Sequence, residues 1–521
     1  MTLRASTPAR TRARRTATVV LSLLAGGLTL PVLSAGPASA ATTDQSYWVP
    51  VSRSVTIRGH GFGHGHGMSQ YGAQGAAKKG LTYRQIMAFY YPRTTWGTVS
   101  GSVRVLITSD TTSDVVVAPV PGMTVKDLGT GTTYPLPSPS GVTRWRLAVD
   151  SNHRTVVQWS DGAWHTWKPG GKSVLTGDGE LAAPSPLRLY TPTGSRTYRG
   201  ALRAASPSTG SASRDTVNVL SMDDYVRGVI PSEMPPSWQT EAVRSQAVAA
   251  RTYATWSRDQ YPSRYYQICD TTACQVYGGA GVEDSRSNAA VTATAKQILT
   301  YGGKPAFTQF SSSSGGWTSS GSVAYLTAKA DPYDAYDGNP VHEWTSTVDV
   351  ARIEKAWPAV GTLRRVHVTR RDGNGEWAGR VWTLVLDGTQ GDVTVSGDSF
   401  RSVLGLKSSW FSIDPTPIIS RWRAIGDTDS PVGDIDTREY RVTGGSVQVF
   451  DTGRIFWSKG TGARELYGAL LSSYRAKGGV TSPLGYPTSG VTTVTGGLRS
   501  TFEHGTLTWN RTTGKVTQTT T

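Results

Sequence analysis

Residues 222–254 read MDDYVRGVIPSEMPPSWQTEAVRSQAVAARTYA, and the second half of this stretch predicts the strongest helix of the chain, over about 238–258. Apolar residues recur there at helical spacing, in one stripe: Val243, Ala247, Ala250 and Ala254. The prolines of VIPSEMPP, immediately before the helix, fix the path by which the chain enters it. A buried helix of this kind should organise the structure around it.

Glu233 lies in this stretch between an apolar segment and two prolines. Burial beside apolar neighbours raises the pKa of a carboxyl toward the value that a general acid needs near neutral pH. The alternative is an ordinary glutamate at the start of the long helix, where the helix dipole favours negative charge. The pattern alone favours this second interpretation.

Strands dominate most of the remaining sequence. Residues 98–215 contain β-rich runs such as VRVLIT and TVVQWS, separated by Gly, Asn and Asp, and are expected to serve as scaffold. Further helices are expected in LTYRQIMAFYYP, stopped by Pro92, and over about 284–297, which leads into a hairpin at Gly302-Gly303. The expected fold class is α+β, with strands dominant and at least three helices.

The C-terminal region contains an internal repeat with a constant offset of 52 residues. The repeated pairs are Trp422/Tyr474, Gly433/Gly485, Gly444-Gly445/Gly496-Gly497, Phe450/Phe502, Gly453/Gly505 and Trp457/Trp509. We therefore expect a linker at 414–419 and a small β-rich module of two units over 420–521. The module lacks clustered acids or histidines, which favours attachment over catalysis.

Residues 59–80, GHGFGHGHGMSQYGAQGAAKKG, hold three of the eight histidines. In an extended segment His64 and His66 share one face, whereas a metal site would need a third ligand that the spacing does not supply. The glycines indicate unusual backbone angles or close approach to a ligand.

The two cysteines, Cys269 and Cys274, form an even pair, which favours a disulfide; zinc is the alternative and would need two further ligands. The serine run at 311–314, followed by two glycines, is typical of a loop, and its hydroxyls could also bind a sugar or a peptide backbone.

The N-terminal 40 residues have the pattern of a secretory signal peptide: five arginines, an apolar run over 19–33, and Ala38-Ser39-Ala40 as a cleavage site. A membrane anchor fits less well because glycine and proline interrupt the apolar run, and Arg14-Arg15 leaves a twin-arginine signal open. Removing the five arginines lowers the formal charge from +16 to +11. A basic secreted protein of this kind suits an anionic cell wall, and the sequence has no nucleic-acid recognition motif.

Five segments together closely resemble the SpoIID/LytB family, the stage II sporulation protein D and amidase-enhancer proteins. They are GHGFGHGHGMSQYGAQGAAKKGLTYRQIMAFYYPRT, DDYVRGVIPSEMPPSWQTEAVRSQAVAARTYA, CQVYGG, FSSSSGGWTSS and FRSVLGLKSSWF. The domain implied covers 41–413, with the Gly/His segment at 55–97, the β-rich segment at 98–215 and the glutamate-bearing segment at 216–413. The repeats resemble the LGFP cell-wall repeat, most closely at PLGYP (483–487).

The resemblance implies peptidoglycan as substrate, Glu233 as catalytic acid/base, and Arg251 as a groove arginine that orients Glu233 or the sugar. It further implies a groove whose substrate-binding residues are His64, His66, Gln70, Tyr71, Tyr253, Gln275, Tyr277, Ser313 and Ser314. No cofactor or metal is expected. In sporulation members the Gly/His segment follows the glutamate segment, whereas here it precedes it, an order that can close the same fold if the chain ends are adjacent.

Three functions follow from these features. The leading hypothesis is a secreted, wall-associated lytic transglycosylase that cleaves MurNAc–GlcNAc bonds. In it Glu233 protonates the glycosidic oxygen and then, as a base, helps the muramic acid C6 hydroxyl attack C1. A hydrolase would need a second carboxylate, and Asp223, Asp224, Glu283 and Asp331 are available. The other hypotheses are a non-catalytic enhancer of an amidase and a purely adhesive wall protein.

Overall fold

The computed structural model describes residues 41–520, so the predicted signal peptide (1–40) lies outside the described residues. The predicted α+β class is confirmed. The described helices are α1 (Gln70–Lys78), α2 (Tyr83–Tyr90), α3 (Met222–Glu233), α4 (Thr240–Gln260), α5 (Ser285–Ala293), α6 (Val350–Ala356), α7 (Gly397–Leu404), α8 (Pro417–Ala424) and α9 (Gly468–Ala476). Within this part of the chain no helix has the length and apolar character needed to span a bilayer.

Two β-sheets are built mainly from the residues between α2 and α3. The seven-stranded sheet has the order β17 (Ile268–Cys269), β5 (Ser102–Leu106), β16 (Asp215–Ser221), β15 (Ala201–Ala205), β12 (Gly179–Ala182), β7 (Thr124–Asp127), β8 (Thr133–Pro135). The six-stranded sheet has the order β11 (Trp164–Trp167), β10 (Thr155–Ser160), β9 (Arg144–Val149), β6 (Val115–Val117), β13 (Leu187–Thr191), β14 (Gly194–Tyr198). The sheets share a core, in which Leu147 of β9 lies against Gly179 of β12.

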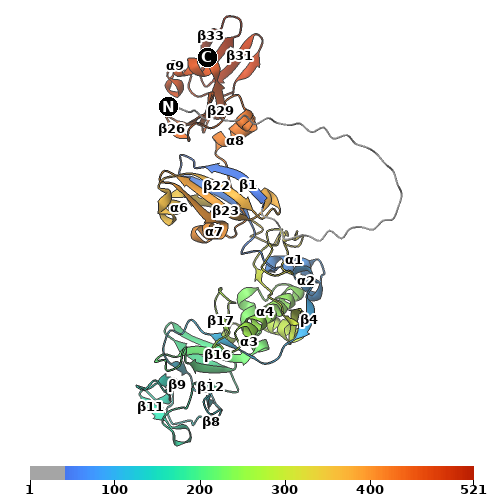
Figure 1. Cartoon of the computed structure of the whole chain (residues 1–521), viewed down its shortest axis with the longest axis vertical. Coiled ribbons are helices and arrows are strands. Elements are labelled where there is room, and N and C mark those ends of the chain that lie inside the picture. The colour runs from blue at the N-terminus through green and yellow to red at the C-terminus, as the bar shows by residue number, and fades with distance from the viewer. Residues whose placement is uncertain (1–40, 521) are drawn as a thin grey trace, which may run out of the picture. The chain divides into compact units, whose positions relative to one another are not determined.

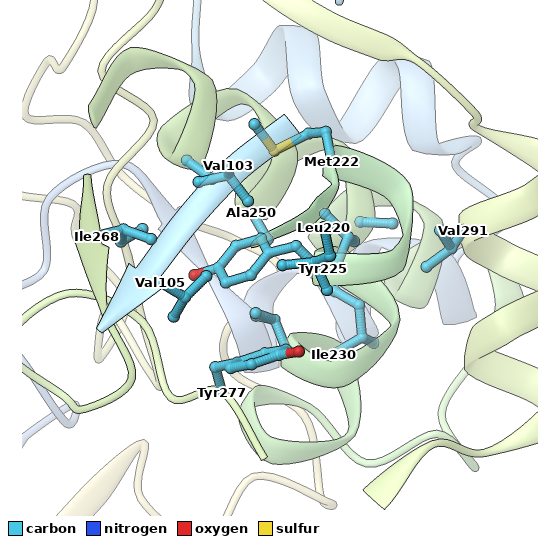
Figure 2. Close-up of a cluster of buried hydrophobic side chains, with 14 of the residues drawn as sticks. Val103, Val105, Leu220, Met222, Tyr225, Ile230, Ala250, Ile268, Tyr277 and Val291 are labelled. Carbon is cyan, nitrogen blue, oxygen red and sulfur yellow. The ribbon is translucent and has the colours of Figure 1, made fainter. Parts of the chain in front are cut away.

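The helix predicted from the apolar stripe is α4, which begins and ends two residues later than expected. The whole stripe is buried, and α4 packs against α1, α2, α3 and α5. Figure 1 shows α4 close to α1, α2 and α3. Small side chains such as Ala250 let the neighbouring elements approach closely. Figure 2 shows Ala250 in one apolar cluster with Tyr225 and Ile230 of α3 and Val105 of β5. The helical layer and the seven-stranded sheet therefore share one core.

The Gly/His segment is tied to residues far downstream in the chain. Its strand β2 (Ser54–His60) lies between β21 (Glu343–Asp349) and β25 (Phe411–Ile413), antiparallel to both. A few residues later β3 (Met68–Ser69) pairs in parallel with β20 (Phe310–Ser311). These pairings bring an early segment beside the late one that precedes the serine loop.

The remaining strands outside the repeats form two small sheets. One has the order β1 (Ala41–Trp48), β22 (Leu363–Arg371), β23 (Val381–Gly388), β24 (Asp392–Ser396). The other has the order β19 (Lys304–Pro305), β18 (Gln297–Tyr301), β4 (Thr95–Thr98), and β18 and β19 form the predicted hairpin. The first of these sheets packs with α6 and α7 around its own apolar core.

The C-terminal repeats form two four-stranded antiparallel sheets. Their strands are β26 (Tyr440–Val442), β27 (Gly445–Val449), β28 (Gly453–Ser458) and β29 (Gly462–Tyr467), then β30 (Thr492–Val494), β31 (Gly497–Phe502), β32 (Gly505–Asn510) and β33 (Val516–Thr520). Helix α8 precedes the first sheet and α9 the second.

The repeated positions make equivalent contacts. Trp422 Nε1 donates to the Gly433 carbonyl at 2.9 Å, and Tyr474 OH donates to the Gly485 carbonyl at 2.7 Å.

The expected linker at 414–419 needs correction at its C-terminal end. Pro417 is the first residue of α8, whose Ile418 and Ile419 are buried, so the helix that carries Trp422 begins inside that range.

Candidate functional site

Glu233 is the last residue of α3, not the first residue of α4. Met234 is extended (φ −141°, ψ 136°) because the residue before a proline is driven out of the helical region, and Pro235 and Pro236 then stop the helix. The interpretation of Glu233 as a glutamate at a helix N-terminus is therefore wrong. The C-terminal end of a helix carries partial negative charge, which disfavours an ionised carboxyl there.

A cavity of about 250 Å³ lies in front of this carboxyl. Its lining residues are His64, Glu233, Tyr253, Thr272, Ala273, Cys274, Gln309 and Phe310. Among these lining residues Glu233 is the only acid, so one carboxyl faces the cavity. Sequence reasoning missed Gln309 and Phe310, although their place directly before the serine run was a signal for them.

The surroundings of Glu233 act on its pKa in two directions. Burial raises the pKa of the carboxyl above its ordinary value. The Val276 N–H donates to Glu233 Oε1 at 2.9 Å and opposes this rise, as does the Gln70 side chain beside the carboxyl. Gln70 Nε2 makes no hydrogen bond with any described residue. The net direction is upward, as general acid catalysis requires.

His64 and His66 lie together, as the period of two predicted. Their rings stack with centroids 4.9 Å apart and an interplanar angle of 20°. The backbone N–H of His66 donates to His64 Nδ1 at 2.9 Å, so the proton of the neutral His64 ring is on Nε2. Burial, with His66 and Arg380 nearby, lowers the pKa of His64 to about 3. A neutral imidazole therefore lines the Glu233 cavity at physiological pH.

His64 also lines a second cavity, of about 410 Å³. The other residues lining it are His66, Ser319, Ser320, Asp372, Asn374, Arg380, Val381, Trp382, Thr383, Ser396, Asp398 and Ser409. The two cavities therefore meet at His64. Trp382 is 42% exposed, so it offers an aromatic surface in this second space, which no sequence motif indicated.

The glycines of the Gly/His segment serve the protein's own packing. Gly61, Gly63, Gly65 and Gly67 all have positive φ, between 67° and 107°. A Cβ at Gly61 would lie 2.7 Å from the Ser313 carbonyl oxygen, so a larger residue does not fit. Unusual backbone angles are confirmed. The neighbours that these glycines allow so close are residues 309–315, Tyr91 and Arg380, so the close approach is to the protein's own chain.

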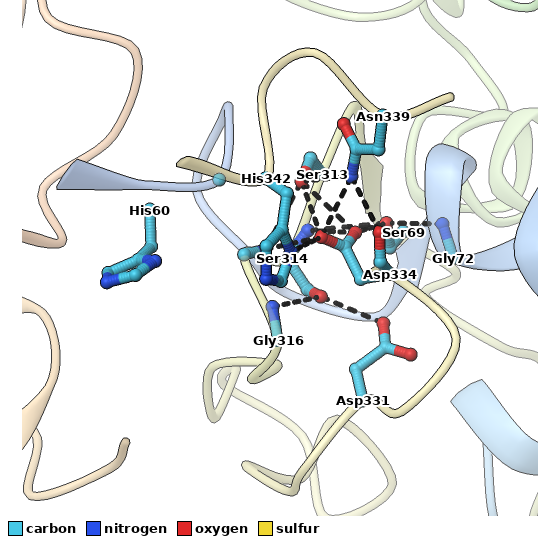
Figure 3. Close-up of polar contacts among 12 residues, drawn as sticks. His60, Ser69, Gly72, Ser313, Ser314, Gly316, Asp331, Asp334, Asn339 and His342 are labelled. Atoms are coloured by element: carbon cyan, nitrogen blue, oxygen red, sulfur yellow. Dashed lines mark hydrogen bonds and ion pairs between the residues drawn. The ribbon is translucent and has the colours of Figure 1, made fainter. Parts of the chain in front are cut away.

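Ser313 and Ser314 belong to a buried polar network (Figure 3). Neither serine lines either of the two cavities. Ser313 Oγ donates to Asp334 at 2.8 Å, and Ser314 Oγ donates to Asp331 at 2.8 Å. Asp334 is fully buried and also accepts hydrogen bonds from Ser69 Oγ (2.6 Å) and His342 Nδ1 (2.9 Å). The two serines therefore hold the loop beside the Gly/His segment, and their assignment to substrate binding is corrected.

Asp334 and His342 shift each other's pKa in opposite directions. Burial alone would raise the pKa of Asp334, but hydrogen bonds from His342, Ser69 and Ser313 leave it below its ordinary value. The same hydrogen bond, which His342 donates to Asp334, raises the pKa of His342. The pair therefore favours a charged carboxylate next to a charged imidazolium.

Arg251 does not reach Glu233. It is fully buried, and its Nε donates to Asp223 Oδ1 at 2.7 Å near the start of α3. Asp223 and Glu233 are ten residues apart on α3, which corresponds to about 15 Å along a helix axis. The expected role of Arg251 in orienting Glu233 or the sugar is corrected: it joins α4 to the opposite end of α3.

Gln275 and Tyr277 are core residues as well. Gln275 Oε1 accepts from Tyr225 OH at 3.0 Å, and Tyr277 OH donates to Asn218 at 2.7 Å. Both side chains are at most 2% exposed, and Figure 2 shows the Tyr277 ring in the apolar cluster. Their assignment to substrate binding is corrected.

The other two tyrosines expected in the groove differ. Tyr253 lines the Glu233 cavity and stacks on Phe307 with ring centroids 5.7 Å apart. Tyr71 packs against Trp238, with centroids 4.9 Å apart, and is absent from the lining of that cavity. Only Tyr253 is placed where a ligand beside Glu233 would touch it.

Cys269 and Cys274 are joined in a disulfide, the favoured of the two sequence alternatives. Their sulfurs bond to each other and so do not form the zinc site of the other alternative. The loop that the disulfide closes contributes Thr272, Ala273 and Cys274 to the cavity wall. It leads directly to Val276, whose N–H binds Glu233.

The four acids considered as a second carboxylate are all engaged elsewhere. Asp223 pairs with Arg251 at 2.7 Å, Glu283 pairs with Arg199 at 2.6 Å, and Asp224 accepts from Ser221 Oγ at 2.7 Å. Asp331 is buried, which raises its pKa to about 6. None of them lines the Glu233 cavity.

Comparisons with known proteins agree with this architecture. Residues 211–301 match the family model described as stage II sporulation protein, and residues 432–482 and 484–519 match the LGFP repeat. The amidase enhancer of Bacillus subtilis is 40% identical over 135 residues, which are 25% of this chain and 17% of that protein. The stage II sporulation protein D of the same organism is 28% identical over 243 residues, which are 41% of this chain and 63% of that protein.

Each match therefore covers less than two thirds of the relative's own length. The first family match includes Glu233, α3 and α4, and the second covers both repeat sheets. The recognition made from the sequence motifs is confirmed. The chain carries a SpoIID domain followed by LGFP repeats.

Proposed function

We propose that the protein is a secreted, wall-associated peptidoglycan-remodelling enzyme, and that Glu233 cleaves MurNAc–GlcNAc bonds by lytic transglycosylation. The observation that carries the proposal is the single buried carboxyl on the wall of the 250 Å³ cavity, with its pKa raised. One carboxyl is enough for this chemistry, whereas the usual glycoside hydrolases use two.

In the proposed mechanism protonated Glu233 donates its proton to the glycosidic oxygen as the bond to C1 breaks. The carboxylate that remains then accepts the proton of the muramic acid C6 hydroxyl, whose oxygen attacks C1. The Val276 N–H stabilises that carboxylate and holds its orientation. The neutral His64 ring and Tyr253 stand on the same wall, where they contact the sugar rings.

The glycan strand is proposed to continue from the Glu233 cavity past His64 into the second cavity. His64 borders both spaces, and the second one offers Trp382 together with polar groups such as Asn374 and Asp398. Cavities of this kind, with aromatic surface and a few polar groups, suit sugar rings. The repeats are proposed to hold the protein on wall polymers, since LGFP repeats are matched there.

A second candidate is a non-catalytic enhancer that binds the wall and stimulates an amidase. It is favoured by the relative named amidase enhancer, at 40% identity. In that case Glu233 would serve binding only.

Digestion of purified glycan strands, followed by mass spectrometry, separates these functions. The proposal expects 1,6-anhydromuramyl ends from the mature protein. Reducing-end muramic acid would indicate hydrolysis instead. No cleavage, together with faster release of stem peptides by an added amidase, would support the enhancer.

A further inference from the structure

The six-stranded sheet β11-β10-β9-β6-β13-β14 has one face in the core and one face open. In β9, Trp145 and Leu147 point inward and are buried, whereas Arg144 and Arg146 alternate with them on the other face. In the described part of the chain no α-helix packs extensively against this sheet, and Ala212 of the loop before β16 borders its open face. The sequence predicted only scaffold here, but the open face carries side chains that a scaffold does not require.

Two arginine–aromatic stacks stand on this face. The Arg146 guanidinium lies 4.0 Å from the ring centre of Trp164, and that of Arg144 lies 4.5 Å from the ring centre of Tyr190. Trp164 is in β11 and Tyr190 is in β13, four strand spacings away, which is about 19 Å. The two neighbouring arginines thus lean toward opposite rings and form one continuous row of flat groups across the sheet.

A hollow of about 590 Å³ borders this row at Arg146, and its lining also includes Asp114, Gln158 and Thr166. Hydrogen bonds fix the side chains in it: Arg146 Nε donates to Gln158 at 2.6 Å, and Gln158 Nε2 donates to Thr166 Oγ1 at 3.3 Å. Arg146 also contacts Asp114 at 3.5 Å. Polar groups held in place beside aromatic surface are the features of a binding site.

The charges of the face favour an anionic ligand. Arg144 and Arg188 are exposed, and neither forms an ion pair with any residue that the structure describes. The acids near the hollow are already compensated, since Asp114 meets Arg146 and Asp150 meets Arg154. The unpaired charge on the face is therefore positive.

We propose that this open face is an accessory binding site for an acidic glycan, namely a peptidoglycan strand whose muramic acid carboxylates meet Arg144 and Arg188. The sugar rings pack on the row of flat groups, and their hydroxyls and amides bind Gln158, Thr166 and Asp114. The identity of the polymer rests on the proposed function. The site shares no lining residue with either cavity at Glu233, so it binds glycan independently of cleavage.

Hydrogen exchange with mass spectrometry locates the binding on the whole mature chain. The Glu233→Gln protein is titrated with glycan strands from which stem peptides have been removed. Residues 144–149, 156–160 and 164–167 are expected to gain protection. The Trp164→Ala/Arg144→Ala protein should need about tenfold more glycan for the same protection, as when an aromatic anchor is removed.

A second variant, Tyr190→Ser/Arg188→Ala, guards against misfolding of the first. Arg364→Ala in β22, outside the repeats and both cavities, is the matched control for loss of one exposed positive charge. Thermal unfolding must be unchanged in the variant that is used. Protection that is absent at these strands, or is equal in wild type and both variants, overturns the proposal. So does protection by a phosphate-containing wall polymer but not by the glycan.

The same data separate this site from the proposed function. Protection of the sheet without protection of residues 64–71, 272–276 and 309–310 would leave the accessory site standing and count against the groove. Protection at the groove alone would support the proposed groove and count against the accessory site.

Discussion

At the residue scale, the position of Glu233 at the end of α3 explains its chemistry. Burial and the negative end of the helix both favour the protonated carboxyl, and the Val276 N–H and the nearby Gln70 side chain oppose them without reversing the direction. The catalytic rate should therefore fall as pH rises through the raised pKa of Glu233, because only the protonated form can act as the acid.

Replacing Gln70 tests this balance. The Gln70 side chain lowers the pKa of Glu233, so Gln70→Ala should move the falling limb of the pH–rate profile to higher pH. The profile of kcat/KM on soluble glycan strands measures the shift. A limb that stays in place or moves to lower pH would contradict the assignment of that limb to Glu233.

His64 should contribute to binding without titrating. Its pKa of about 3 keeps the ring neutral from pH 5 to 8, so His64→Asn should lower kcat/KM by about tenfold, the effect of removing one good contact. The shape of the pH–rate profile over that range should be the same as in the wild type. A limb that disappears in the variant would show that His64 itself carries the catalytic proton.

At the scale of secondary structure elements, the sequence predicted those elements whose residues recur at a regular spacing. Helix α4 and the repeat units follow from regular spacing, and both were found within a few residues. Helices α3 and α1 were missed because Pro231 lies inside α3 and glycines interrupt α1. Missing α3 led to the helix-start interpretation of Glu233, whereas the placement of Arg251 beside it came from the family resemblance. Sequence separation alone did not show that Arg251 reaches the far end of α3.

The serine loop depends on Asp334. In Asp334→Asn the partly buried His342 and the buried serines lose their charged partner, so the free energy of unfolding should drop by about 3–5 kcal/mol. Asp337→Asn, an exposed position three residues on, is the matched control and should change stability by less than about 0.5 kcal/mol. Thermal and denaturant unfolding measure both. Equal stability of the two variants would contradict a structural role for Asp334.

The stabilisation from His342 has a definite pH dependence. Its folded-state pKa is raised, so its contribution is fully present below the ordinary value of 6.5 and is lost as pH rises through the folded pKa. The difference in stability between wild type and His342→Gln should shrink over that window. A stability difference between the two proteins that grows with pH would contradict a raised pKa of His342.

At the scale of the whole molecule, the site could not be predicted in full because its segments lie far apart in the sequence. The Gly/His segment reaches the cavity because β2 pairs with β21 and β25, and β3 with β20, contacts across more than 200 residues. Short strands do not reveal such partners in the sequence, so His64 could be named while its neighbours Gln309 and Trp382 could not. The motifs indicated the segment that we propose to be catalytic, and the family resemblance indicated which residue in it to choose.

The repeats should retain the protein on the wall without affecting cleavage. Trp457→Ala/Trp509→Ala changes equivalent, partly buried positions of the two sheets and should reduce co-sedimentation with purified walls several-fold. Cleavage of soluble strands should be unchanged. Tyr440→Ala is the matched control, an exposed aromatic residue with no counterpart 52 residues later. Undiminished sedimentation of a folded double variant would contradict the attachment role.

The most direct test of the central claim compares the products formed by wild type, Glu233→Gln and Glu343→Gln on the same purified glycan strands. Glu343 is an exposed glutamate that lines neither cavity at Glu233, so it controls for the substitution itself. We predict 1,6-anhydromuramyl ends from wild type and Glu343→Gln, and a rate at least about 100-fold lower from Glu233→Gln. Anhydromuramyl ends formed at the wild-type rate by Glu233→Gln would contradict the account.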